Sequence, residues 1–298
     1  MIGFIGTGNM GSAMAISLLN QGYKLIVHDL NKPSAKELIQ HGAKWAESPK
    51  ELASKSNIIC SMLPSEIETD KVIYDSDGIL EGIKPNTIYI DHTTNSPEFI
   101  KKVGESIAEK KSFMIDAPVM GDRQSIQEGI LTFYVGGEFE IFKKIENILY
   151  TIGNEVVFVG ELGSASVTKI SLNALTMGID LLATECFTLA VKSGVNLNKL
   201  LDAVDKAKIF GDNSSIKKRM PETLFKGKFL PSRFFLKLAY KDYRLFNHLS
   251  FKNKVPTRLV NLCEMEMLEA INNGWENHER VISSTLQEKR SNVQLRTN

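Results

Sequence analysis

The residues with the clearest chemical use form a glycine-rich turn near the start of the chain. The turn consists of Gly6, Thr7, Gly8, Asn9, Met10 and Gly11. An apolar run at 2–5 precedes it and a helix-like run at 12–21 follows it, which is the context that a dinucleotide-binding G-x-G-x-x-G turn requires. Its glycines permit a sharp bend, close approach of the backbone to a pyrophosphate, and tight packing of the helix whose first amides face the anion. We therefore predict that this turn binds a nicotinamide or flavin nucleotide, the alternative being a glycine-rich turn without a ligand.

An acidic residue follows the glycine turn at a sequence separation typical of the residue that discriminates between NAD and NADP. A strand-like run ends at His28, and Asp29 comes directly after it, 18 residues beyond Gly11. A carboxylate at about this distance accepts hydrogen bonds from the ribose hydroxyls of NAD and repels the additional phosphate of NADP. Leu30 stands where an arginine would suit NADP, although Lys32 could still meet a phosphate. We predict NAD as the cofactor and keep NADP as the alternative.

A second group of polar residues interrupts an apolar helical run in the middle of the chain. Apolar residues recur at helical spacing from 164 to 192 without a proline, and Gly194 follows as a C-terminal cap. Ser166, Lys169 and Asn173 are three or four residues apart, so they share one face of this helix. Either they belong to a site, or Lys169 is merely solvated where the helix reaches the surface.

Composition excludes several classes of partner. The chain has 298 residues, of which 43% are hydrophobic and 24% charged, and its net charge is +1. Such a balance gives no electrostatic case for nucleic acid or a membrane as the main partner. No uninterrupted apolar run reaches the roughly 20 residues of a membrane span, and the N-terminus begins with a strand rather than a signal-like segment. The length itself predicts about two domains.

Cysteine and histidine usage excludes two further kinds of site. The three cysteines, Cys60, Cys186 and Cys263, are odd in number and far apart, so we expect no disulfide framework and a cytoplasmic location. The five histidines show no metal-ligand spacing and do not cluster with the cysteines, so we predict no metal site.

The elements that must position these residues divide the chain into two parts. Strand-like runs alternate with helical ones, which begin at signals such as Ser48-Pro49 and Ser96-Pro97. Strands are expected at 2–5, 25–28, 58–62, 87–90, 113–116, 132–135 and 156–159. Helices are expected later, at 164–192, 197–205, 234–249, 257–271 and 279–289. This order predicts an α/β fold, with a doubly wound, mostly parallel Rossmann-type sheet at 1–161 and an all-helical domain at 162–298. We expect the long apolar helix to join the two domains as a spine rather than to lie at the surface.

Several segments combine glycine and polar residues in a recognisable order. They lie at 3–11, 91–97, 116–121, 129, 136–137 and 160–173, and are followed by Phe234, Leu238, Lys241 and Asp242. Together they resemble the motifs of the β-hydroxyacid dehydrogenase family, which includes 3-hydroxyisobutyrate dehydrogenase and tartronate semialdehyde reductase. The resemblance covers nearly the whole chain. It implies NAD(P)-dependent oxidation of a 3-hydroxy acid, or reduction of the corresponding semialdehyde.

The resemblance also implies roles for individual residues. Lys169 would exchange a proton with the reacting oxygen, and Asn173 would orient that oxygen or a carboxylate. The cofactor-binding residues implied beyond the glycine turn and Asp29 are Leu63, Pro64, Thr94 and Lys241. A free lysine has a pKa of about 10.4 and is a proton donor at neutral pH, so carbonyl reduction is the easier direction. Lys241, as a neighbouring cation, would help to expose the neutral amine for the reverse reaction.

One segment departs from the family pattern. Where the family continues Ser-Gly-Gly in its substrate-binding motif, this chain has Met120, Gly121 and Asp122. Backbone amides could still cradle a carboxylate, but the serine hydroxyl is replaced by a flexible apolar side chain. We predict that these three residues bind a substrate with more apolar bulk or with a different polar group. Asp122 could repel a carboxylate and Arg123 attract one, or both could be solvated at a helix start.

Two other functions are compatible with parts of this sequence. An imine reductase would share the architecture, but many such enzymes carry another residue at the position of Lys169. A non-catalytic NAD-binding scaffold would be expected to lose the acid–base group, whereas this chain retains Lys169, Asn173 and Lys241. The apolar run at 259–268 leaves room for a homodimer or homotetramer interface. The other partner that we expect is a small-molecule hydroxy acid or aldehyde.

Overall fold

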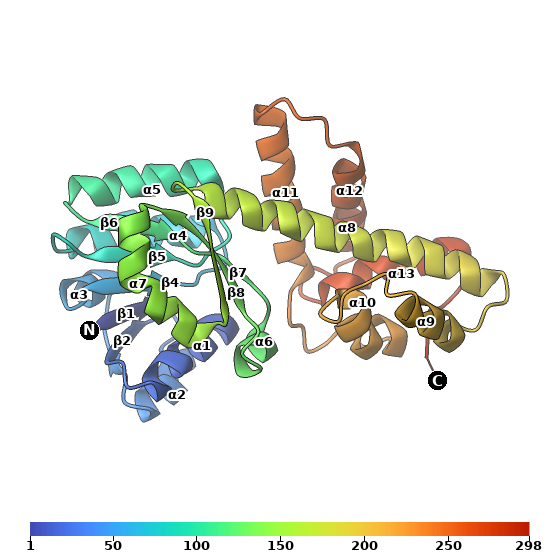
Figure 1. The fold of residues 1–298 in the computed structure, drawn as a ribbon, viewed down its shortest axis with the longest axis horizontal. Helices are drawn as coiled ribbons and strands as arrows, with labels where there is room; N and C mark the ends of the chain where they lie inside the picture. The colour runs from blue at the N-terminus through green and yellow to red at the C-terminus, as the bar shows by residue number, and fades with distance from the viewer. Residues whose placement is uncertain (298) are drawn as a thin grey trace. The chain divides into compact units, whose positions relative to one another are not determined.

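The computed structural model describes residues 1–297 and divides into two compact units, Met1–Lys169 and Ile170–Asn298 (Figure 1). The first unit is an α/β domain, and the second is built of helices. The long helix α8 (Ser164–Lys192) begins in the first unit and continues into the second. Its bounds are those expected from the sequence. The domain boundary predicted at 161 lies just before this helix and stays a prediction.

The first unit is organised around one twisted sheet. Its strands are β1 (Ile2–Ile5), β2 (Leu25–His28), β3 (Lys44–Trp45), β4 (Ile58–Ser61), β5 (Ile88–Asp91), β6 (Phe113–Asp116), β7 (Val119–Met120), β8 (Thr132–Gly137) and β9 (Glu155–Gly160). Their order is β3-β2-β1-β4-β5-β6-β8-β7, with β9 beside β8. The strands from β1 to β6 pair in parallel, whereas β8 runs antiparallel to β6 and β7. The predicted doubly wound, mostly parallel sheet is therefore confirmed.

The direction of winding reverses between β1 and β4. From β1 the chain proceeds to β2 and β3 on one side, and later to β4, β5 and β6 on the other. In open α/β sheets, ligands bind at the carboxyl ends of the strands beside such a reversal. The two short strands β3 and β7 were not expected from the sequence, because a run of two residues carries no detectable periodicity.

Helices cover both faces of the sheet. They are α1 (Asn9–Asn20), α2 (Lys36–Gln40), α3 (Pro49–Ser54), α4 (Glu66–Tyr74), α5 (Pro97–Glu109), α6 (Arg123–Gln127) and α7 (Phe139–Ile152), with 3-10 turns at Lys32–Ala35 and Ile79–Glu81. Residues of α1, α2, α6 and α7 form one apolar cluster with the sheet, and residues of α3, α4 and α5 form another. Because both faces are buried, the central strands are apolar throughout rather than alternating.

Serine caps fix where several of these helices begin. The Ser48 hydroxyl accepts the Glu51 N–H at the start of α3, and the Ser96 hydroxyl accepts the Phe99 N–H at the start of α5. In both helices proline follows the cap, where its missing N–H has no intrahelical partner to lose. The start signals read from the sequence therefore correspond to real helix boundaries.

The second unit contains the remainder of α8, followed by helices and short turns. They are α9 (Leu197–Lys206), α10 (Ser215–Lys218), α11 (Leu236–Lys252), α12 (Arg258–Asn272) and α13 (Ser284–Ser291), with 3-10 turns at Met220–Glu222, Leu224–Lys226 and Arg280–Ser283. The segment expected as one helix at 279–289 is thus a 3-10 turn followed by α13. Two apolar clusters hold the unit together, and a buried ion pair joins Arg280 to Asp180 at 2.7 Å.

The expectation that α8 avoids the surface is wrong for one of its faces. Leu175, Leu182 and Leu189 are 57%, 62% and 69% exposed, whereas Ile170, Met177 and Phe187 are buried. By length and composition α8 is also the one helix within residues 1–297 that could cross a membrane, although core helices of soluble proteins pass the same test. Helical periodicity reveals which residues share a face, but not which face another element covers.

Candidate active site

The glycine turn joins β1 to α1 with the geometry that a dinucleotide requires. Gly6 has a φ of +88°, and a Cβ there would lie 2.3 Å from the Met62 backbone oxygen. A Cβ on Gly11 would lie 1.9 Å from the Gly6 oxygen, so both positions exclude a side chain. Gly8 instead faces open space, with no described heavy atom within 4 Å of a Cβ built on it.

Helix α1 leaves its first backbone amides available to an anion. Gly8 is its N-cap, no side-chain cap hydrogen bond is present among the described residues, and its first turn contains no acidic residue. Asn9 and Met10 form that first turn. Uncapped N–H groups together with the positive end of the helix dipole favour a phosphate group. These residues fit the pyrophosphate of a dinucleotide, which the first backbone amides of α1 would hold.

Asp29 lies at the same end of the sheet and contacts the glycine turn. Its Oδ2 accepts the Thr7 N–H at 2.6 Å, and its Oδ1 accepts the Asn31 N–H at 2.8 Å. The next residue is Leu30, an apolar side chain that is 95% exposed, so this position offers no basic group to a second phosphate. The structure thus brings the predicted ribose-binding carboxylate beside the predicted pyrophosphate-binding turn.

The loops after β4 and β5 are tied to each other. The Leu63 N–H donates to the Thr93 hydroxyl at 3.0 Å, which connects the segment of Leu63 and Pro64 with the segment of Thr93 and Thr94. Both loops follow the carboxyl ends of neighbouring parallel strands. The predicted cofactor contacts Leu63, Pro64 and Thr94 therefore come from one connected region.

A fully buried carboxylate organises this region. Asp91, at the end of β5, accepts hydrogen bonds from the Ser61 hydroxyl at 2.8 Å, the Thr93 N–H at 3.0 Å and the Asn95 side-chain amide at 2.8 Å. Burial raises the pKa of Asp91 to about 6, and the three hydrogen-bond donors oppose that rise. Asp91 was part of a recognised motif, but nothing in the sequence indicated which donors it would bind.

The predicted proton-transfer lysine contacts the predicted substrate-binding segment. Lys169 lies on α8 with only 7% of its surface exposed, and its Nζ is 3.8 Å from the Met120 Sδ of β7. Gly121 follows with a φ of +136°, a conformation that favours glycine. The possibility that Lys169 is simply a solvated surface residue is therefore excluded.

Asp122 lies at a helix start, one of the two alternatives that the sequence left open, and its side chain caps that helix. Its carboxylate accepts the Ser125 N–H at 3.1 Å, and the Ser125 hydroxyl accepts the Asp122 N–H at 3.1 Å. This reciprocal capping box starts helix α6. Arg123 approaches Glu37 at 3.9 Å on the surface. The contribution of Asp122 to substrate binding stays a prediction.

In the second unit, two further predicted residues gather around one buried carboxylate. The Asn173 side-chain amide donates to the Asp242 Oδ2 at 2.6 Å, and the Lys241 Nζ lies 3.3 Å from the Asp242 Oδ1. Asp242 is 2% exposed, so the charge of Lys241 compensates a carboxylate removed from water. Asp242 thereby fixes the orientation of the Asn173 amide.

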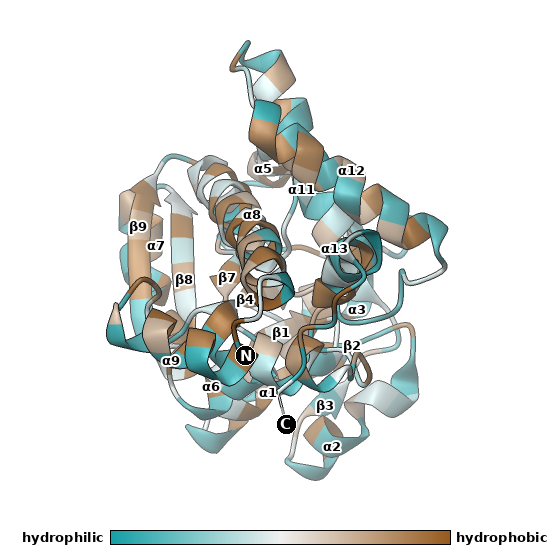
Figure 2. Cartoon of the chain, turned by 90° about the vertical axis from the view of Figure 1, so that its right-hand side faces the viewer, coloured by the Kyte–Doolittle hydropathy of each residue, from teal (hydrophilic) through white to brown (hydrophobic). Residues whose placement is uncertain are grey.

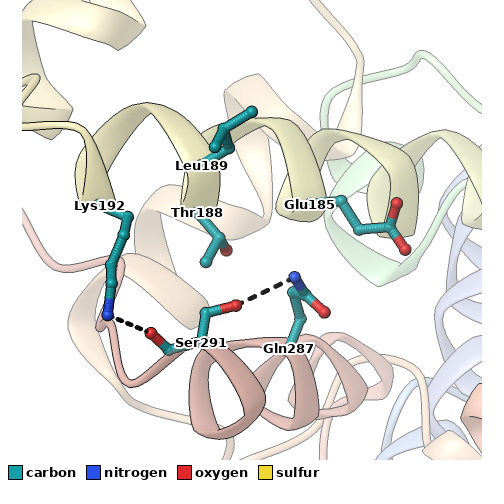
Figure 3. Close-up of a pocket in the computed structure, with 6 residues that line it drawn as sticks. All are labelled: Glu185, Thr188, Leu189, Lys192, Gln287 and Ser291. Atoms are coloured by element: carbon teal, nitrogen blue, oxygen red, sulfur yellow. Dashed lines mark hydrogen bonds between the residues drawn. The ribbon is translucent and has the colours of Figure 1, made fainter.

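A pocket elsewhere in the second unit contains none of the predicted site residues. Figure 3 shows it between α8 and α13, where Lys192 donates to the Ser291 backbone oxygen at 2.8 Å and Gln287 donates to the Ser291 hydroxyl at 3.2 Å. Within the described residues, no group of three or more histidine, cysteine or acidic side chains could hold a metal ion.

Known protein families match the two parts of the chain separately. A family model described as the NAD binding domain of 6-phosphogluconate dehydrogenase matches residues 1–160. A second model, described as NAD-binding of NADP-dependent 3-hydroxyisobutyrate dehydrogenase, matches residues 163–283. The fold and these matches define a protein with an NAD(P)-binding domain.

Individual relatives agree with this class. A probable mitochondrial 3-hydroxyisobutyrate dehydrogenase from Dictyostelium discoideum is 36% identical over 67% of this chain, and the alignment spans 62% of that protein, less than two thirds of its length. A 2-(hydroxymethyl)glutarate dehydrogenase from Eubacterium barkeri is 30% identical over 86% of this chain and 84% of its own. The crystal structure of a 3-hydroxyisobutyrate dehydrogenase from Salmonella typhimurium superposes with a TM-score of 0.85 at 22% identity, covering 96% of this chain and 99% of that one.

The chain belongs to the β-hydroxyacid dehydrogenase family.

Proposed function

We propose that this chain is an NAD(P)-dependent oxidoreductase that oxidises a 3-hydroxy acid resembling 3-hydroxyisobutyrate, or reduces the corresponding semialdehyde. The observation that carries the proposal is the contact between Lys169 and Met120 at 3.8 Å. It joins the proposed proton-transfer group to the proposed substrate-binding segment. The names of the two relatives, both hydroxyacid dehydrogenases, support the reaction class.

The reaction needs one hydride acceptor and one proton acceptor. A nicotinamide cofactor, held by the glycine turn and Asp29, would supply the first as a hydride acceptor. Lys169 supplies the second, removing the hydroxyl proton during oxidation and returning a proton to the carbonyl oxygen during reduction. The resemblance to the family implies that Asn173, whose side-chain amide donates to Asp242, holds the substrate, and that Lys241 contributes to cofactor binding.

The proposed cofactor is NAD, with NADP as the alternative. Asp29 supports this preference because its carboxylate lies against the glycine turn, where a second phosphate on the ribose would meet a negative charge. The variant Asp29→Ala should lower the ratio of kcat/KM with NAD to kcat/KM with NADP. An unchanged ratio would show that Asp29 does not discriminate between the cofactors.

On the substrate side, we propose that Met120 and Gly121 favour substrates with apolar bulk, with Asp122 at the edge of the segment. The Met120 side chain is partly buried and contributes a flexible thioether where the family has a hydroxyl. A panel of 3-hydroxy acids with graded side-chain size tests this. Larger apolar substrates should outperform glycerate-like ones, and Met120→Ser should reduce or reverse that order. A wild-type preference for glycerate-like substrates would contradict this role.

The decisive experiment on the reaction is the variant Lys169→Met. Loss of a general acid–base group should lower kcat by about 100-fold to 10,000-fold, while NADH binding measured by fluorescence is retained. The matched control is Lys192→Met, which removes a lysine from the other end of α8, where it contacts Ser291. Turnover by Lys169→Met at the wild-type rate would refute the proposed mechanism.

Two alternative functions make different predictions. An imine reductase from Myxococcus stipitatus superposes with a TM-score of 0.65 at 17% identity, a likeness that shows the fold alone. The retained Lys169 favours hydroxy acids, and assays with cyclic imines beside hydroxy acids separate the two. A non-catalytic scaffold would bind NAD by calorimetry yet turn over none of the panel.

We further propose a cytoplasmic homodimer or homotetramer that acts on a small molecule. Exposed apolar side chains support the assembly: Leu259, Leu262 and Met265 of α12 are 78%, 67% and 56% exposed. Brown, apolar residues recur along α12 and α8 (Figure 2). Analytical ultracentrifugation should show a dimer or tetramer, and Leu262→Glu should shift it toward monomer. A monomeric wild-type protein at assay concentrations would overturn this part.

A further inference from the structure

A second buried carboxylate, Asp116, ends strand β6 directly beside Asp91 of β5. The two residues are register partners in the parallel ladder, and both are 0% exposed. Whereas Asp91 binds donors from the loops after β4 and β5, Asp116 binds the start of α8. Its Oδ1 accepts the Gly163 N–H at 3.1 Å, and its Oδ2 accepts the Ser166 N–H at 2.9 Å. The site proposed above assigns Asp116 no role.

These two hydrogen bonds fix the first turn of α8 to the end of the sheet. The first N–H groups of a helix have no intrahelical acceptor, and a carboxylate there also interacts favourably with the helix dipole. Lys169 lies three residues after Ser166, so the anchored turn is the one directly preceding it. Because Ser166 and Lys169 are about one helical turn apart on α8, anchoring Ser166 to the sheet also constrains where Lys169 lies along and around the helix axis.

The same strand also leads to the residue that Lys169 contacts. Only three residues separate Asp116 from Met120, whose Sδ lies 3.8 Å from the Lys169 Nζ. Lys169 and Met120 are therefore both positioned relative to the same part of the fold, the carboxyl end of β6. A shift of α8 against that point would change the position of the lysine with respect to the segment at 119–121.

A side chain on the neighbouring strand β8 would collide with the Asp116 carboxylate. Gly136 of β8 is its antiparallel register partner, and a Cβ on Gly136 would lie 2.4 Å from the Asp116 Oδ1. The same Cβ would lie 2.8 Å from the Glu161 backbone oxygen. Burial raises the pKa of Asp116, and the backbone donors of Gly163 and Ser166 oppose that rise.

We propose that Asp116 is a positioning residue for proton transfer, which holds Lys169 in its reactive place by anchoring the first turn of α8. The inference rests on the proposed function, because it assumes that Lys169 transfers the proton. It does not require Asp116 to touch substrate or cofactor.

The test is Asp116→Asn, which keeps the size of the side chain but replaces one acceptor oxygen with a donor. One of the two backbone N–H groups then loses its acceptor, and the turn shifts. We expect kcat per NADH-binding site to fall by roughly 10-fold to 100-fold, since a displacement of about 1 Å at a reacting group has such effects. The affinity for NADH should change by less than about twofold, because the glycine turn is untouched.

The isotope effect distinguishes positioning from mere loss of folded protein. With substrate deuterated at the carbinol carbon, a misplaced lysine slows the chemical step, so the primary isotope effect on kcat should rise in Asp116→Asn. A purely structural role would lower the number of NADH-binding sites and leave both the isotope effect and kcat per site unchanged. That result would overturn the inference.

Two further variants complete the experiment. Ser48→Ala is the matched control, because it also removes a side-chain acceptor from a helix start in the same unit, but at α3 rather than at α8. It should leave kcat per site and the isotope effect at wild-type values. If Asp116→Asn does not fold, Gly136→Ala crowds the same carboxylate and should give the same signature, and wild-type kinetics in Gly136→Ala would overturn the inference.

Failure of the inference and failure of the proposed function give different results. If Lys169→Met retains turnover, the proposed function fails whatever Asp116→Asn does. If Lys169→Met is inactive while Asp116→Asn has wild-type kcat per site and isotope effect, only the positioning role fails.

Discussion

His92 should make the stability of the first unit depend on pH. Its ring lies between Phe4 and Phe133, with centroid distances of 6.5 Å and 5.4 Å, and the residue is 1% exposed. The Nδ1 lies 2.8 Å from the Ala117 backbone oxygen and therefore carries the proton that it donates. The Nε2 is buried with no hydrogen-bond partner among the described residues. Protonation would place a charge and an unsatisfied N–H at that nitrogen, so burial lowers the pKa of His92 from 6.5 to about 4.

The size and sign of the effect follow from that shift. A difference of about 2.5 pKa units corresponds to a free energy on the order of 3 kcal/mol. Because the folded pKa is below the unfolded one, the unfolded chain binds more protons between these two values. The contribution of neutral His92 to the free energy of unfolding is therefore complete above about pH 6.5 and is lost as the pH falls toward about 4.

The assay compares urea unfolding of the wild type and His92→Phe at several pH values. The variant keeps an aromatic ring but loses the titration, and the unpaired Ala117 oxygen adds a pH-independent cost of about 1–3 kcal/mol. The stability advantage of the wild type should shrink by about 3 kcal/mol between about pH 7 and pH 4. Parallel curves for the two proteins, or an NMR titration of His92 near pH 6.5, would refute the reasoning.

Three further outcomes are expected. For Asp91 the pH dependence of stability has the opposite sign to that of His92, because burial raises the pKa of Asp91 to about 6. Relative to Asp91→Asn, the free energy of unfolding of the wild type should fall by about 3 kcal/mol as the pH rises from about 4 to 6, measured by the same urea series. Gly11→Ala should weaken NADH binding at least about tenfold by fluorescence titration, since its Cβ would lie 1.9 Å from a backbone oxygen of the turn, whereas Gly211→Ala, which meets nothing within 4 Å, should bind normally. Asp180→Asn breaks the buried ion pair with Arg280 and should cost about 3–5 kcal/mol in denaturant unfolding, and a cost below 1 kcal/mol would contradict burial of that charge.

Much of the fold could be predicted because its signals are local. Apolar runs flanked by turn residues located seven of the strands within about two residues, and serine–proline caps located helix starts. The bounds of α8 followed from uninterrupted helical spacing up to a glycine. The cofactor end of the site was equally local, since the glycine turn and Asp29 lie within one strand–helix–strand unit.

Other features of the site could not be predicted because they depend on contacts between distant segments. Asp116 binds the N–H groups of Gly163 and Ser166, which lie 47 and 50 residues away in sequence. The sequence left Asp122 either as a possible substrate contact or at a helix start, and only the structure showed that its carboxylate caps α6. Residue type alone gives the hydrogen-bonding capacity of a carboxylate, whereas its partners depend on what the fold brings within about 3 Å.

By itself the sequence determined the α/β class, the dinucleotide turn and the segments that identify the family, because each depends on residue types at short, fixed spacings. The tertiary structure decided that Lys169 is buried against Met120 and that one face of α8 is exposed. It also paired Asp91 with Asp116 at the carboxyl ends of adjacent strands. Burial and register are set by how the sheet and its covering helices pack, and a linear pattern does not contain that information.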